Sequence, residues 1–229
     1  MKQKLIIIGA GGFAKTVIDS LDHEKYEIEG FIDTFKTGEH QGYPILGDTL
    51  GVIDEPNQYL YFIAIGDPDY RALWMKLIEE MKLSTINVID RTSIISEHSR
   101  LGTCIYIGKM AIINCDSELE DGVVINTRAL VEHGNYISYC TNISTNVVLN
   151  GDVFVGEKSF IGSCTVVNGQ LKIGNSSIIG SGSVVIRDVP DNVVVAGAPT
   201  KFIRARGFLL CREFILLLKL VVIITEISS

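Results

Sequence analysis

The 229-residue chain has few aromatic residues, few prolines and few cysteines. Aromatic residues make up 8% of it, proline occurs five times, and the five cysteines include no CxxC spacing. This composition excludes a small disulfide scaffold. The odd number of cysteines and the lack of CxxC favour free thiols in a reducing cytosol. His23, His40 and His98 form no ligand-like spacing with acids or cysteines, so we expect no metal site.

Long uncharged hydrophobic runs are also missing. The most apolar segment is the tail, residues 207–229, and its longest uncharged run is the six residues from Leu220 to Thr225. A transmembrane helix needs about 20 such residues, so we expect no membrane span. The apolar run near the N-terminus is too short for a signal-peptide core. The sequence therefore predicts a cytoplasmic protein, with at most a weak membrane contact through the tail.

Isoleucine, valine and glycine are abundant instead. Ile and Val together account for 52 residues and Gly for 22, and the mean hydropathy is +0.30. Such a composition excludes a disordered chain, which needs low hydrophobicity. The net charge of −7 disfavours a nucleic-acid-binding surface but leaves anionic small substrates open.

The first 89 residues alternate between expected strands and helices. Apolar runs predict strands at residues 4–8, 28–32, 59–65 and 86–89, and helical periodicity predicts helices at 13–22 and 70–81. This alternation indicates a small, Rossmann-like parallel α/β sheet. The segment is too short for a complete six-stranded NAD-binding fold.

A glycine-rich loop follows the first expected strand. Gly9, Gly11 and Ala14 fit the pattern G-x-G-x-x-[GA], and Asp33 follows the loop near the spacing expected of an acid that binds ribose. Glycines at such a loop let the backbone approach a phosphate at a helix N-terminus. The loop alone fits a dinucleotide, another nucleotide or sugar, or a tight turn that binds nothing.

The rest of the chain has a period of six. Every sixth residue from Ile89 to Val185 is Ile, Leu or Val, which gives seventeen aliphatic positions in an unbroken series. A period of six matches neither a helix nor a simple strand, and it is typical of the hexapeptide parallel β-helix. Three hexads form one triangular coil, with the aliphatic side chains stacked inside.

Three segments resemble the NeuD/PglD family of sugar acetyltransferases over about residues 3–205: GAGGFAKTVIDSL, VINTRALVEHGNYI and GSGSVVIRDVPDNVVVAGAPTKFIR. NTR-x-LVEHGN with NISTNVVLNGDV is most similar to the NeuD-type sialic acid O-acetyltransferases of bacterial capsule biosynthesis. The resemblance implies a Rossmann-like acceptor domain (residues 1–85) and a left-handed β-helix that binds acetyl-CoA (residues 86–206). The tail, residues 207–229, lies outside it.

The same resemblance implies a homotrimer, with acetyl-CoA in the groove between neighbouring β-helices. The glycine loop then holds the acceptor sugar rather than NAD. His133 becomes the counterpart of the general base, which takes a proton as the acceptor attacks the thioester. Glu132 either orients His133 or the neighbouring subunit, or is a polar residue of the coil wall.

Two positions depart from relatives that act on nucleotide-linked amino sugars. Those relatives often carry an acid directly after the catalytic histidine and a second histidine nine residues later, where this chain has Gly134 and Asn142. The Asn142 amide can still donate a hydrogen bond to a developing oxyanion. Some amino-sugar enzymes also have histidine where this chain has Phe13. These departures favour a hydroxyl acceptor.

The resemblance also assigns binding residues. For acetyl-CoA these are Asn142, Gly162, Ser163, Gly180, Ser181, Gly197 and Lys201. Basic residues near the end of the repeat, Lys201, Arg204 and Arg206, are candidates to meet the CoA phosphates. The residues that the resemblance assigns to the acceptor are Gly9, Gly11, Gly12, Phe13, Asp33 and Gly66. We add Arg128, because its guanidinium can bind a sialic acid carboxylate.

The sequence therefore predicts acetyl transfer from acetyl-CoA to a hydroxyl of free or CMP-linked sialic acid. An alternative is N-acetylation of a UDP- or dTDP-linked amino sugar. A third hypothesis, from another class, is a non-catalytic trimeric scaffold for sialic acid synthesis.

Overall fold

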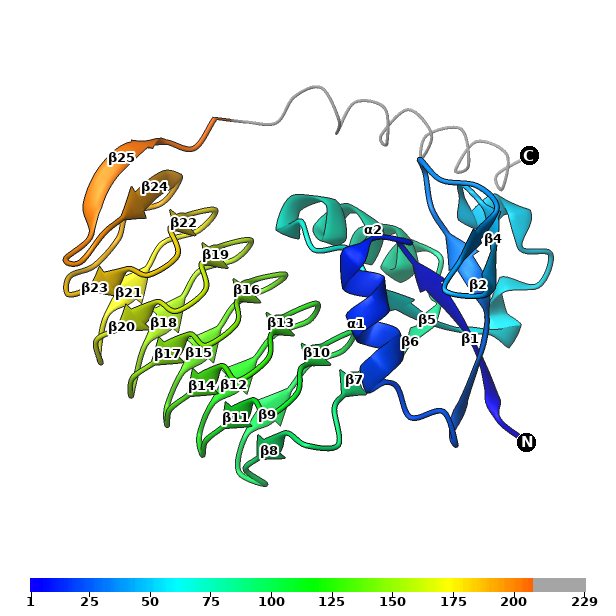
Figure 1. Cartoon of the computed structure of the whole chain (residues 1–229), viewed down its shortest axis with the longest axis horizontal. Helices are drawn as coiled ribbons and strands as arrows, with labels where there is room; N and C mark the ends of the chain where they lie inside the picture. Colours follow the sequence, from blue (N-terminus) through cyan, green and yellow to red (C-terminus); the bar gives the residue numbers. More distant parts are fainter. Residues whose placement is uncertain (208–229) are drawn as a thin grey trace.

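A computed structural model of the chain describes residues 1–207, which form two domains packed side by side (Figure 1). The N-terminal domain is a six-stranded sheet of order β3-β4-β2-β1-β5-β6 with two helices. Its elements are β1 (Gln3–Ile8), α1 (Gly12–Ser20), β2 (Tyr26–Ile32), β3 (Glu39–His40), β4 (Tyr43–Gly47), β5 (Leu60–Ile63), α2 (Pro68–Glu80) and β6 (Ser84–Thr85). Two 3₁₀ turns, η1 (Leu50–Val52) and η2 (Pro56–Gln58), precede β5.

The predicted parallel α/β arrangement is confirmed. Strand β1 pairs in parallel with both β2 and β5. The β3–β4 hairpin was not predicted, because its strands are short and the second contains Pro44. A proline is tolerated there because the hairpin lies at the edge of the sheet.

The predicted β-helix is also confirmed. Each strand pairs in parallel with the strand three hexads further along, as in Tyr106 with Val124 and Val124 with Asn142, so three hexads complete one coil. The two-residue strands form three sheets, which we name by their first strands. The β7 sheet contains β7 (Val88–Ile89), β10 (Tyr106–Ile107), β13 (Val124–Ile125), β16 (Asn142–Ile143), β19 (Phe160–Ile161) and β22 (Ile178–Ile179), followed by β24 (Val193–Ala196) and β25 (Lys201–Ala205). The β8 sheet contains β8 (Ile94–Ile95), β11 (Ile112–Ile113), β14 (Leu130–Val131), β17 (Val148–Leu149), β20 (Val166–Val167) and β23 (Val184–Val185), and the β9 sheet contains β9 (Arg100–Leu101), β12 (Glu118–Leu119), β15 (Tyr136–Ile137), β18 (Phe154–Val155) and β21 (Lys172–Ile173).

The aliphatic residue of each hexad points into the coil. From Ile107 to Val185 these side chains are at most 1% exposed. The first coil differs, because no preceding coil covers it: Ile89 is 39% exposed, and Ile95 and Leu101 are partly exposed. The antiparallel β24–β25 hairpin follows the last coil. Predictions for the tail beyond Gly207 lie outside the described residues.

The outward residues of the sheets differ in chemistry. In the β8 sheet every outward residue is aliphatic and keeps some exposure: Ile94, Ile112, Leu130, Val148, Val166 and Val184. In the β9 sheet they are Arg100, Glu118, Tyr136, Phe154 and Lys172. The β7 sheet is covered in its first coils by the N-terminal domain, and the buried core of that domain extends to Tyr106, Val124 and Cys140.

A buried arginine joins the two domains. Arg71 of α2 is fully buried, and its Nε donates to the Gly122 carbonyl oxygen at 2.7 Å. Its terminal nitrogens donate to the carbonyl oxygens of Ile65 and Cys140, each at 2.7 Å, and to the Asn142 side chain. Burial lowers the pKa of the Arg71 guanidinium. Neutral carbonyls thus provide most of its hydrogen-bond acceptors, and they fix α2 against the β-helix.

Candidate active site

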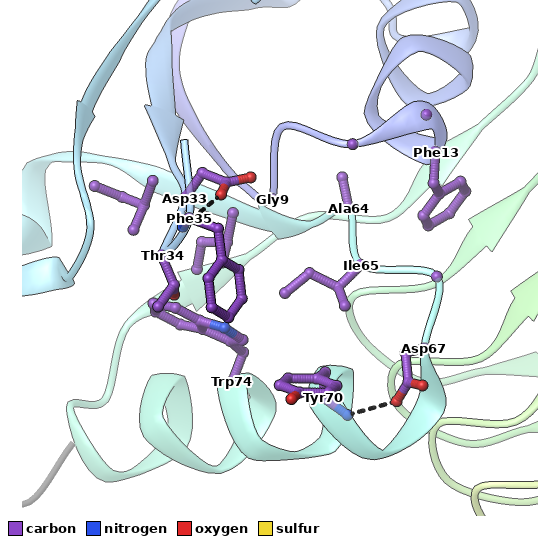
Figure 2. A pocket seen from close by; sticks show the side chains of 15 residues that line it. Gly9, Phe13, Asp33, Thr34, Phe35, Ala64, Ile65, Asp67, Tyr70 and Trp74 are labelled. Carbon is purple, nitrogen blue, oxygen red and sulfur yellow. Dashed lines mark hydrogen bonds between the residues drawn. The ribbon is translucent and has the colours of Figure 1, made fainter. Parts of the chain in front are cut away.

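The N-terminal domain has a pocket of about 400 Å³ beyond the carboxyl ends of β1, β2 and β5 (Figure 2). This edge is where open α/β sheets bind ligands. Six of the seven predicted acceptor residues line it: Gly9, Gly11, Gly12, Phe13, Asp33 and Gly66. The seventh, Arg128, lies elsewhere, exposed on a corner of the β-helix.

The three glycines of the loop serve two purposes. Gly9 has φ +97°, and a Cβ there would lie 2.8 Å from Cγ1 of Ile65, so only glycine fits. At Gly11 and Gly12 a Cβ would meet nothing within 4 Å, which leaves room for a ligand. Helix α1 begins at Gly12 without a side-chain cap or an acidic residue in its first turn. Its free amides therefore form a site suited to an anion such as phosphate.

Asp33 holds the glycine loop in place. Its Oδ2 accepts a hydrogen bond from the amide of Ala10 at 2.7 Å, and its Oδ1 accepts from the amides of Phe35 and Lys36 at 2.9 and 3.0 Å. The Lys36 ammonium donates to the Ala10 carbonyl oxygen at 2.6 Å and brings a positive charge to the same loop. The predicted contact of Asp33 with a ribose stays a prediction.

An aromatic wall of the pocket was not predicted. Phe35, Tyr70 and Trp74 line the pocket opposite the glycine loop, as Figure 2 shows. Tyr70 and Trp74 are four residues apart on α2 and therefore share one face of the helix, which is a signal available in the sequence. Trp74 is 3% exposed and supports the wall from the core, so Phe35 and Tyr70 provide most of its accessible surface. Flat aromatic faces beside an anion site suit a base or another ring attached to phosphate.

His133 lies on the corner between β14 and β15, and its side chain is 59% exposed. A Cβ at Gly151, one coil further on, would lie 2.4 Å from Cε1 of the imidazole, so the ring rests against the glycine. Asp152 places its Oδ1 3.9 Å from Nδ1 of His133. The expected outward orientation is confirmed, whereas the catalytic role stays a prediction.

Glu132 has a partner one coil below. Its Oε2 accepts a hydrogen bond from the Asn114 side chain at 3.0 Å, and its backbone carbonyl accepts one from the Ser117 hydroxyl at 2.9 Å. These contacts fit a polar residue of the coil wall.

Asn142 lies at the domain junction and is 3% exposed. Its Nδ2 donates to the Gly66 carbonyl oxygen at 2.6 Å, and its Oδ1 accepts from Arg71. The amide thus ties the acceptor pocket to the β-helix. A contact with acetyl-CoA stays a prediction.

The glycines assigned to acetyl-CoA are needed by the coil itself. A Cβ at Gly162 would lie 2.5 Å from the Ser181 amide nitrogen, and one at Gly180 would lie 2.7 Å from the Ala196 Cβ. Ser163 and Ser181 follow these glycines and keep exposure at the corner after the β7 sheet. Gly197 has φ +107°, and Lys201 is exposed on β25. Their ligand contacts remain predictions.

A second pocket, of about 390 Å³, lies near these residues. Its wall includes Pro68 at the start of α2, Phe160, Ile178 and Arg204. Arg206 also lies in the wall of this pocket, and its contact with the CoA phosphates stays a prediction. It forms a salt bridge with Asp69 and donates to the Lys158 carbonyl oxygen at 3.0 Å, so it links the last strand to α2.

Within one chain the acceptor pocket and His133 do not meet. Every residue lining the pocket belongs to the N-terminal domain, and His133 lies on a corner that adjoins the β8 and β9 sheets. In the part of the chain that the structure describes, no group of three or more potential metal ligands is found, and no helix has the length and apolarity to cross a bilayer.

Known proteins resemble both domains. The PglD N-terminal domain family matches residues 4–78. A variant of perosamine N-acetyltransferase from Caulobacter crescentus, solved with CoA and GDP-perosamine, is 33% identical with a TM-score of 0.84. That match covers 87% of this chain and 96% of the other.

The acetyltransferase domain of PglB from Neisseria gonorrhoeae, solved with acetyl coenzyme A, is 29% identical with a TM-score of 0.83. It aligns over 89% of this chain and 100% of its own length. A comparison with curated proteins finds no match. This chain therefore belongs to the left-handed β-helix sugar acetyltransferases that carry a PglD N-terminal domain.

Proposed function

We propose that this protein transfers the acetyl group of acetyl-CoA to the amino group of a nucleotide-linked amino sugar. The observation that carries the proposal is the pocket, in which an anion site at the start of α1 faces an aromatic wall. This combination fits the phosphate and the base of a nucleotide sugar better than it fits a free sugar acid. The solved relatives with GDP-perosamine and CoA support the same acceptor class.

The reaction needs a base at the acceptor nitrogen. The amine attacks the thioester carbon, a C–N bond forms and the C–S bond breaks. His133, exposed on its corner, takes the proton that the nitrogen loses, and the CoA sulfur leaves as a thiolate that is then protonated. In this proposal the acceptor amine itself attacks the thioester, so transfer is direct and no acetylated enzyme is formed.

In this proposal each active site contains residues from more than one copy of the chain. The outward stripe of the β8 sheet is aliphatic along six coils and partly exposed, which is the chemistry of a subunit contact. Packing that stripe against a neighbour also brings the adjoining His133 corner next to another subunit. We propose a homotrimer in which His133 of one copy serves the acceptor pocket of the next.

Acetyl-CoA is placed along the corner that follows the β7 sheet. Ser181 is exposed there and Ser163 is partly exposed, and Phe160 and Ile178 of the neighbouring pocket offer an apolar surface to pantetheine. Lys201 and Arg204 are exposed on β25 as candidates for the CoA phosphates, and Arg206, which pairs with Asp69, lies in the same pocket wall as Arg204. The free cysteines among the described residues fit the proposed cytoplasmic location.

O-acetylation of sialic acid is the second candidate. It is favoured by Arg128, whose side chain is exposed on the corner between β13 and β14. His133 lies on the next corner, five residues later. If a sialic acid carboxylate binds there, Arg128→Ala raises the KM for sialic acid and leaves that for acetyl-CoA unchanged. An unchanged KM for sialic acid contradicts this candidate.

A panel of acceptors tests the main proposal. Purified protein is mixed with acetyl-CoA and with GDP-, UDP- or dTDP-linked amino sugars, free sialic acid or CMP-sialic acid, and thiol release is followed. We expect release only with a nucleotide-linked amino sugar, and its loss in His133→Ala. Release only with a sialic acid selects the second candidate. No release with any acceptor, together with a gain of activity in partner enzymes, selects the trimeric scaffold.

A further inference from the structure

Asp152 occupies the space beside His133 that a side chain at residue 134 would need. A Cβ built on Gly134 would lie 2.1 Å from Oδ1 of Asp152, although the two residues are one full coil apart. The carboxylate therefore lies directly over the glycine that follows His133. The distance from this oxygen to Nδ1 of His133 is 3.9 Å.

The backbone around the pair is fixed. The Asp152 amide donates a hydrogen bond to the His133 carbonyl oxygen at 2.9 Å, so the two corners are held in register. Gly151 lets the imidazole lie against the next coil, since a Cβ there would lie 2.6 Å from Nε2. Only side-chain rotation separates the present distance from a hydrogen bond, and such bonds are often long until substrate binds.

We propose that Asp152 is the positioning residue for His133. It accepts a hydrogen bond from Nδ1–H, which fixes the imidazole in one orientation and leaves Nε2 unprotonated and free to take the proton from the acceptor. The other nearby acid, Glu132, is held by Asn114 and is directed to the coil below. This inference rests on the proposed acetyl transfer with His133 as the base.

Exchanging the residues at positions 134 and 152 tests this proposal directly. Asp152 has φ +60° and Gly134 has φ +68°, and both glycine and aspartate tolerate this region. Asp152→Gly therefore removes the carboxylate without backbone strain, and Gly134→Asp returns one from the neighbouring coil. Asp116→Asn is the matched control, because Asp116 is exposed on the same corner, at φ +56°, one coil below Gly134.

We expect Asp152→Gly to lower kcat by about 10- to 100-fold, which is part of the 10²–10⁴ that a general base supplies, with both KM values within about threefold. The exchange Gly134→Asp with Asp152→Gly is expected to recover most of kcat. In a His133→Ala background Asp152→Gly has no further effect, because its influence passes through the imidazole. A wild-type kcat in Asp152→Gly overturns the proposal. So does a fall in kcat that is as large when Asp152→Gly is made in the His133→Ala background as when it is made in the wild type.

A readout independent of turnover separates this inference from the proposed function. Proton–nitrogen correlation spectra of ¹⁵N-histidine-labelled protein report which ring nitrogen carries the proton, and His133→Ala assigns the signal. We expect the Nδ1–H form in the wild type and in Asp116→Asn, and its loss in Asp152→Gly at unchanged Tm. The same tautomer in Asp152→Gly and the wild type overturns the positioning role, even if no acceptor in the panel reacts.

Discussion

The N-terminal domain and the β-helix build their cores from different side chains. The N-terminal core includes buried aromatic residues such as Phe31, Tyr61 and Phe62, whereas the core of the β-helix is aliphatic along its length. A large ring fits between the sheet and helices of an α/β layer, but a coil of two-residue strands has room only for stacked aliphatic side chains. Aromatic residues of the β-helix, such as Tyr136 and Phe154, therefore stack on its outer face.

This difference assigns different tasks to the two regions. The irregular domain forms a shaped pocket with an anion site and an aromatic wall, and the repetitive one presents residues at fixed spacing. In the proposed function, the chemistry of the β-helix lies at a corner whose residues differ from those of the neighbouring coils, at the exposed His133. Substitutions in each region test this assignment of tasks. The largest expected effect comes first and the smallest last.

Removing the imidazole is expected to have the largest effect. His133→Ala lowers kcat by about 10²–10⁴, because the attacking nitrogen loses its base. The Tm stays at the wild-type value, since the side chain is exposed. Steady-state kinetics with a nucleotide-linked amino sugar measure the change, and a kcat within threefold of wild type contradicts the catalytic role.

Breaking the junction between the two regions comes next. Arg71→Met leaves buried carbonyls of both domains without their donor, so we expect the free energy of unfolding to fall by about 3–5 kcal/mol. Lys76→Met on the same helix is the control, because its side chain is 73% exposed. Urea unfolding followed by circular dichroism measures both. Equal stability of the two variants would show that the junction does not depend on Arg71.

The aliphatic stripe of the β8 sheet gives the third prediction. Leu130→Glu places a charge in the proposed subunit contact, so the dissociation constant of the trimer rises by about 100-fold or more. Analytical ultracentrifugation shows the change. Lys172→Glu, on the charged β9 sheet, is expected to remain trimeric. A Leu130→Glu protein that sediments like the wild type argues against this stripe as the interface.

The aromatic wall gives the fourth prediction. Phe35 lines the acceptor pocket and is 68% exposed, so Phe35→Ala does not disturb the core. Losing one stacking face is expected to raise the KM for the nucleotide sugar by about 5- to 30-fold, with the KM for acetyl-CoA unchanged. Phe202→Ala, similarly exposed on β25, is the control. A raised KM for acetyl-CoA with an unchanged KM for the nucleotide sugar would contradict the assignment of this pocket to the nucleotide sugar.

The smallest effect concerns the buried thiols at the junction. Burial raises the pKa of Cys104 to about 12 and that of Cys140 to about 11, against 9.0 for an ordinary thiol. The folded state therefore keeps protons that the unfolded state releases above pH 9, and stability falls as pH rises from 9 towards 11. We expect a loss of about 1 kcal/mol per thiol at about pH 9.5. Thermal melts test this, and Cys104→Ala with Cys140→Ala should flatten the pH dependence.

How much the sequence predicts differs between the two regions for a physical reason. In the β-helix each hexad forms the same short strand and corner. The period of six in the sequence is therefore enough to predict the coil, the inward residues and the position of His133 on a corner. The glycine loop and Asp33 were also found, because their spacing is local. The Asp152–His133 pair and the Asn142–Gly66 contact were not, since each joins residues that only the folded chain brings together.

The aromatic wall lies between these cases. Tyr70 and Trp74 share a helix face that the sequence shows, but Phe35 comes from the loop after β2, and its place beside them depends on the packing of α2 under the sheet. The salt bridge between Arg206 and Asp69 was not predicted, because only the folded chain brings the end of the repeat beside α2.

The bond formed in the product tests the central claim most directly. Protein, acetyl-CoA and a GDP-, UDP- or dTDP-linked amino sugar are incubated, and the mass of the product is measured by mass spectrometry before and after treatment with alkaline hydroxylamine, which cleaves oxygen esters but leaves amides intact. The account predicts a nucleotide sugar heavier by one acetyl group that hydroxylamine does not remove. A product formed only on sialic acid, with an acetyl group that hydroxylamine removes, would contradict it.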